Sequence, residues 1–127
     1  MNINKKRVLI VDDDEQSRMV FDRLLRSLGF KTVFASDGED AISMLVLDPG
    51  FDLIVTDVIM PHMTGFDFTR RLKEYPRTGN IPVLGTSVYH DWHRTIDMRD
   101  LIVDGFIGKP VEREALMKEL DRVMMGR

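Results

Sequence analysis

Acidic side chains, a hydroxyl and an amine stand just after four short apolar runs of the sequence. Asp12 and Asp13 follow the first run, Asp57 follows a later one, and Ser87 and Lys109 follow two more. Carboxylates are the ligands that a hard cation such as Mg²⁺ prefers, and an ammonium adds a point positive charge. This combination fits transfer of a phosphoryl group to a carboxylate, with an aspartate as the nucleophile.

Short β-branched runs alternate with longer segments of helical spacing, and this pattern predicts an α/β fold with a doubly wound parallel sheet covered by helices on both faces. Strands are expected over residues 7–11, 31–35, 51–56, 82–86 and 105–107. Helices are expected over about 14–28, from the cap at 36–37 to 48–50, after 64–65, over 89–100 and over about 111–125. In an open parallel sheet, ligands bind beyond the carboxyl ends of the strands, so the acids, the hydroxyl and the amine are expected at one edge.

The first expected helix carries an apolar repeat. Val20, Leu24 and Leu28 recur every fourth residue, and we expect them to face the core. Gly29 supplies the usual stop. The remaining inward positions are expected in the later helices, at Ala41, Ile42, Leu45, Phe68, Leu72, Leu116, Leu120, Val123 and Met124.

Length and composition favour one ordinary globular domain over residues 1–127. The 127 residues carry a formal net charge of −3, and the basic runs are short, which argues against a purely electrostatic nucleic-acid binder. The absence of cysteine excludes disulfides and thiolate metal sites. The apolar run near the N-terminus is too short for a signal peptide or a membrane span, so we expect a cytoplasmic location.

Taken together, these motifs resemble the receiver domain of two-component response regulators over essentially the whole chain. Residues 8–13 resemble the family's first strand with its acidic pair, and residues 57–65 resemble its phosphoacceptor loop. Residues 81–84 lead to Ser87, where the family has its switch threonine or serine. Lys109-Pro110 matches the lysine of the family and the proline after it, a bond that is often cis.

The resemblance implies a five-stranded, flavodoxin-like sheet with the strand order 2-1-3-4-5. It implies Asp57 as the phosphoacceptor and Mg²⁺ or Mn²⁺ as the cofactor. The implied metal ligands are Asp12, Asp13, Asp57 and the backbone carbonyl of Ile59.

The resemblance also implies a signalling switch rather than an enzyme. Ser87 and Lys109 would contact the phosphoryl group, and Phe106 stands at the place of the family's mobile aromatic. Output would pass through the face formed by the fourth helix, the fifth strand and the last helix. The implied partners are a histidine kinase or histidine phosphotransfer protein as donor and a downstream effector protein or fused output domain, without direct binding to nucleic acid or membrane.

Two other readings stay open. A degenerate receiver that acts as a constitutive interaction module is favoured by departures from the family pattern at Val88, Gly85 and Ile102-Val103. A haloacid-dehalogenase-like phosphatase is suggested by the acids at 12–14, but Gln16 stands where that class has a threonine or valine. Acids also favour helix N-termini, and Asp14 is expected to be a helix cap.

Overall fold

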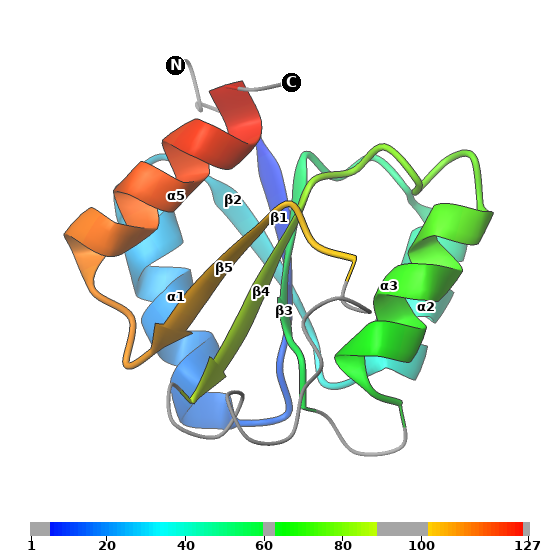
Figure 1. The fold of residues 1–127 in the computed structure, drawn as a ribbon, viewed down its shortest axis with the longest axis horizontal. Coiled ribbons are helices and arrows are strands. Elements are labelled where there is room, and N and C mark those ends of the chain that lie inside the picture. Colours follow the sequence, from blue (N-terminus) through cyan, green and yellow to red (C-terminus); the bar gives the residue numbers. More distant parts are fainter. Residues whose placement is uncertain (1–5, 60–62, 89–101, 126–127) are drawn as a thin grey trace.

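A single parallel sheet forms the centre of the molecule (Figure 1). The computed structural model describes residues 6–59, 63–88 and 102–125. Within them the strand order is β2-β1-β3-β4-β5, as the resemblance implies. The strands are β1 (Arg7–Val11), β2 (Lys31–Ala35), β3 (Leu53–Asp57), β4 (Val83–Val88) and β5 (Gly105–Lys109).

Helices cover both faces of this sheet. They are α1 (Glu15–Ser27), α2 (Gly38–Leu47), α3 (Gly65–Glu74) and α5 (Arg113–Met125). The side chains of Asp14, Asp37 and Thr64 cap the first three by accepting the backbone N–H three residues later. Gly29, with φ of 104°, follows the end of α1 as predicted. The helix expected over 89–100 lies outside the described residues.

Alternation along the central strands sorts the core into two layers. On β1, Leu9 and Val11 pack with α2 and α3, whereas Val8 and Ile10 pack with α1 and α5. This alternation follows because successive side chains of a strand point to opposite faces. The sheet is therefore buried on both sides, and functional groups can gather only at its edges.

The apolar stripe expected on α1 is confirmed at Leu24 and Leu28 and wrong at Val20. Phe21 and Leu25 are the buried residues of this helix, Leu24 and Leu28 are partly buried beside them, and Val20 is 45% exposed. The two stripes are neighbouring columns about 100° apart on a helix of 3.6 residues per turn.

Three strands extend further toward their carboxyl ends than expected. Asp57 is the last residue of β3, Ser87 lies inside β4 and Lys109 is the last residue of β5. The expected strand ends at 56, 86 and 107 are therefore too early. Ladder pairing continues through these positions, with Asp57 opposite Thr86 and Ser87 opposite Gly108.

Two departures from the family pattern, Gly85 and Val103, pack against each other. A Cβ added at Gly85 would lie 3.3 Å from a methyl group of Val103 and 3.2 Å from the ring of Phe106. The missing side chain of Gly85 thus leaves the space that Val103 and Phe106 occupy. Ile102 and Val103 differ in burial, because Ile102 is 42% exposed while Val103 packs against the core.

Among the described residues, no helix has both the length and the apolar character that crossing a membrane requires.

Candidate functional site

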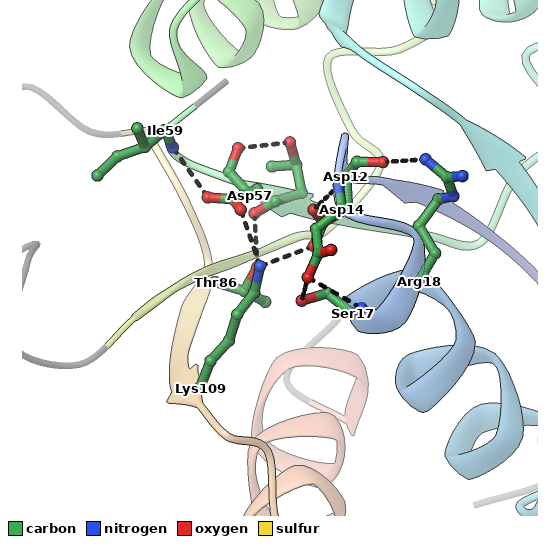
Figure 2. A network of polar contacts seen from close by, with 9 residues as sticks. Asp12, Asp14, Ser17, Arg18, Asp57, Ile59, Thr86 and Lys109 are labelled. Atoms are coloured by element: carbon green, nitrogen blue, oxygen red, sulfur yellow. Dashed lines mark hydrogen bonds and ion pairs between the residues drawn. The ribbon is translucent and has the colours of Figure 1, made fainter. Parts of the chain in front are cut away.

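Asp12, Asp57 and Lys109 meet at the carboxyl edge of the sheet. The Lys109 Nζ lies 2.7 Å from Asp12 Oδ2 and 2.8 Å from Asp57 Oδ2 (Figure 2). Asp12 is 1% exposed and Asp57 is 9% exposed. The amine from β5 therefore joins two buried carboxylates that come from the ends of β1 and β3.

Backbone amides hold the other oxygen of each carboxylate. The N–H of Asp14 donates to Asp12 Oδ1 over 2.9 Å, and the N–H of Ile59 donates to Asp57 Oδ1 over 2.9 Å. Hydrogen bonds to a charged group are stronger than those between neutral groups. Both carboxylates are thus oriented before any ligand arrives (Figure 2).

Burial and charge pairing shift the pKa values of Asp57 and Lys109 in opposite directions. Burial raises the pKa of Asp57 above its ordinary value, although the Lys109 ammonium opposes this rise. Burial also disfavours the charged form of Lys109, but hydrogen bonds from its amine to Asp12 and Asp57 outweigh burial and raise the pKa of Lys109. Lys109 therefore stays protonated beside its two acidic partners.

Asp13 adds a third, exposed carboxylate to the site. One oxygen each from Asp12, Asp13 and Asp57 lies within 4.8 Å of the others, so the three can hold one metal ion. Counted formally, three carboxylates and one ammonium give a charge of −2, which is opposite to the charge of Mg²⁺. The all-oxygen donor set fits Mg²⁺ or Mn²⁺ rather than a metal that prefers thiolates or imidazoles.

Comparison with protein families matches residues 8–121 to the response regulator receiver domain. The chain belongs to the response regulator receiver family. The receiver is 36% identical over 118 residues to the two-component response regulator ORR3 of Oryza sativa, covering 93% of this chain and 90% of ORR3. It is 35% identical over 118 residues to the chemotaxis protein CheY of Pseudomonas aeruginosa, covering 92% and 94% of the two chains.

Some relatives are much longer than this receiver. The chain is 34% identical over 129 residues to the 3',5'-cyclic-nucleotide phosphodiesterase regA of Dictyostelium discoideum, covering 97% of this chain. It spans only 16% of the length of regA. Receivers of this family thus occur in proteins of different size.

Solved structures support the same fold. The chemotaxis response regulator CheY4 of Vibrio cholerae has a TM-score of 0.82 at 29% identity, covering 94% of this chain and 99% of CheY4. The signal receiver domain of a histidine kinase from Syntrophus aciditrophicus has a TM-score of 0.84 at 30% identity, covering 95% and 91% of the two chains.

The two residues expected to act as a switch, Ser87 and Phe106, lie on β4 and β5. Ser87 is 2% exposed and stands one residue beyond Thr86, the register partner of Asp57. Phe106 is partly buried on β5, opposite Gly85. No hydrogen bond among the described residues joins the Ser87 hydroxyl to Lys109 or Asp57.

Sequence reasoning missed one residue that supports the receiver site. The Nη1 of Arg18 donates to the backbone carbonyl of Asp12 over 2.8 Å and so braces the turn after β1 (Figure 2). No spacing signal distinguishes this arginine from the other basic residues of α1. Asp14 is the helix cap that the sequence predicted, and the hydrogen bond from the Ser17 hydroxyl lowers the pKa of Asp14.

Proposed function

We propose that this receiver takes a phosphoryl group onto Asp57 from a histidine kinase or a histidine phosphotransfer protein. The observation that carries the proposal is the position of the Lys109 ammonium between Asp12 and Asp57. An ion pair with only a structural role would need a single carboxylate beside Lys109. Here two oriented carboxylates, a third within reach and one amine gather at the edge where parallel sheets bind ligands.

Each group has a role in the proposed transfer. A carboxylate oxygen of Asp57 attacks the phosphorus, and the bond from phosphorus to the donor's histidine nitrogen breaks, with its electron pair returning to the imidazole. The product is an acyl phosphate on Asp57. Lys109 supplies positive charge beside the phosphoryl oxygens, and the N–H of Ile59 keeps the Asp57 carboxylate in place.

A divalent cation is part of this proposal. Asp12, Asp13 and Asp57 would hold Mg²⁺ or Mn²⁺ through carboxylate oxygens, and the backbone carbonyl of Ile59 is proposed as a further ligand. When bound, the cation would neutralise charge that develops on the phosphoryl oxygens. Asp13 is the exposed member of the set and is therefore the ligand that can change its position at the least cost in packing.

Incubation of the wild-type chain with a small phosphodonor, with and without Mg²⁺, separates the three readings of the sequence. A stable single phosphoryl adduct that requires Mg²⁺, seen by intact-mass spectrometry, supports the switch. No adduct under any condition indicates a constitutive interaction module. Repeated release of phosphate that depends on Asp12 indicates a phosphatase.

Replacing Ser87 by alanine should separate phosphorylation from the change of shape. Ser87 is not part of the ion-paired cluster, so the Ser87→Ala variant should still form the adduct. Loss of the hydroxyl should remove most of the conformational response, because a phosphoryl group shifts a two-state balance only through contacts that favour one state. Amide spectra recorded before and after phosphorylation measure this response.

Ser87→Thr is the matched control, since it keeps the hydroxyl and should keep the response. A response of wild-type size in Ser87→Ala would refute the switch role of this side chain. The proposed readout is a repacking of Phe106, which already lies against the space left by Gly85. The output would pass from the face formed by the expected fourth helix, β5 and α5 to an effector protein or to a fused output domain.

A further inference from the structure

An apolar groove lies between the C-terminal parts of α2 and α3, the two helices on the right of Figure 1. It has a cavity volume of about 410 Å³. Its walls are formed mainly by apolar and aromatic side chains of the two helices and of the turn after α3, namely Ile42, Leu45, Val46, Leu72, Tyr75 and Pro76.

This groove lies far from the cluster around Asp57. The turn after α3 leads toward the start of β4, so the groove is near the amino ends of the strands. Asp57 is the last residue of β3 and lies at the opposite, carboxyl end of the sheet. A ligand in the groove would therefore leave the phosphoacceptor accessible.

Apolar side chains at the groove are exposed to solvent. Val46 is 68% exposed, Tyr75 is 50% exposed, and Leu47, the next residue along α2, is 88% exposed. Leu47 is not part of the groove wall, so the apolar surface extends past the cavity itself. An exposed, contiguous apolar surface of this kind is typical of a protein interaction site, and tyrosine is enriched at such sites.

Positive charge accompanies the apolar surface. Arg71 and Arg77 line the groove, and within the described parts of the chain neither guanidinium forms an ion pair. Arg70, one position away, is by contrast paired with Asp67 over 2.9 Å. Residues 65–80 contain four basic and two acidic side chains, whereas the whole chain has a net charge of −3. The residues that line the groove thus include two arginines and no acidic side chain.

We propose that the groove binds an acidic amphipathic helix of a partner protein. Apolar side chains of that helix would enter between α2 and α3, and its carboxylates would face Arg71 and Arg77. Arginine donates two parallel hydrogen bonds to a carboxylate and is common at binding hot spots. A helix is favoured over a small carboxylate ligand because the exposed surface continues beyond the cavity to Leu47. This proposal does not depend on phosphorylation of Asp57.

A synthetic peptide tests the proposal directly. The probe is a peptide of about 18 residues, long enough to form a helix, with leucine along one face and glutamate elsewhere. A second peptide carries lysine in place of each glutamate, and octanoate serves as a small carboxylate. Binding to the full chain is followed by chemical shifts of the backbone amides. We expect saturable binding of the acidic peptide, with the largest shifts in α2, α3 and the turn at 75–78.

Surface variants locate the binding energy. Reversing the charges of both groove arginines, in the double variant Arg71→Glu with Arg77→Glu, should lower the affinity for the acidic peptide about tenfold. Val46→Asp, at an exposed residue of the groove wall, should lower it by a similar factor. Arg70→Glu and Met117→Asp are the matched controls outside the groove, and each should change the affinity by less than about twofold. Raising the ionic strength to about 1 M should also weaken binding, because screening then acts within about 3 Å.

Several results would overturn the proposal. They are failure of the acidic peptide to bind, equal binding of the basic peptide, or equal loss in the groove variants and their controls. Binding of octanoate at the groove without binding of the peptide would assign the site to a small ligand instead. The changed side chains are exposed, apart from the partly buried Arg71, so circular dichroism should show that each variant remains folded. The arginine variant and Val46→Asp test the same groove separately.

Discussion

Replacing Asp57 by asparagine is expected to abolish the phosphoryl adduct. Asparagine has nearly the same shape, but Ile59 and Lys109 donate to different oxygens of Asp57, so its single amide oxygen can take the place of only one of these two acceptors. It lacks the carboxylate charge and the nucleophilic oxygen that form an acyl phosphate. Intact-mass spectrometry after treatment with Mg²⁺ and a small phosphodonor should show one added group on the wild type and none on the Asp57→Asn variant.

Asp14→Asn is the matched control for this result. Asp14 is also an acid next to the site, but its side chain caps α1 through Ser17 and does not contact Lys109. Its variant should therefore form the adduct to the wild-type extent. An adduct that persists in Asp57→Asn would place the reactive oxygen elsewhere, and an adduct lost from both variants would show only that the acidic edge is sensitive to charge.

Replacing Gly65 by alanine is expected to destabilise the fold by about 3 kcal/mol, at the upper end of the range for overpacked positions. A Cβ at Gly65 would lie 2.5 Å from the Cα of Val58, and backbone at that distance cannot be relieved by rotating a side chain. The N–H of Gly65 also donates to the carbonyl of Val58 over 2.9 Å. The start of α3 is thereby fixed directly against the segment that follows Asp57.

Urea denaturation of Gly65→Ala and Gly38→Ala provides the comparison. A Cβ at Gly38 would lie 2.8 Å from the sulfur of Met63, which is the flexible end of a side chain. Gly38 also opens α2, where alanine has the better helix propensity. We expect Gly38→Ala to change the free energy of unfolding by less than about 1 kcal/mol. Equal unfolding midpoints for the two variants would contradict the steric argument.

Much of the fold could be predicted from local signals because those signals have local causes. Asp14, Asp37 and Thr64 cap their helices through hydrogen bonds that reach only three residues along the chain. The order of the strands could not be obtained in this way, and it came from the resemblance to the receiver family. Its confirmation rests on the ladder pairing of residues that are far apart in sequence.

The errors arose where long-range packing decides between close alternatives. On α1, the column of Val20 and the column of Phe21 both have helical spacing, and only contact with the sheet shows which is buried. The ends of β3, β4 and β5 were placed too early because polar residues resemble strand terminators in sequence, although their backbones continue the ladder. These shifts did not move the site, since the edge of the sheet remains the same.

The residue types of the candidate site were predictable, but the contacts among them were not. Sequence reasoning placed Asp12, Asp57 and Lys109 at one edge without showing that a single amine reaches both carboxylates. It gave no sign of Arg18, whose donation to the carbonyl of Asp12 depends on the turn between β1 and α1. Side-chain contacts of this kind depend on three-dimensional positions that no spacing rule contains.

The bond between Lys109 and Asp12 joins residues 97 positions apart, so it has a consequence for the order of folding. Closing such a long loop is entropically costly, and β5 leaves a ribosome after the other four described strands. A nascent chain that has completed β3 holds Asp12 and Asp57 without their lysine. The charged edge is therefore completed only after β5 has been made, and so is the apolar layer that contains Ile107 and Leu116.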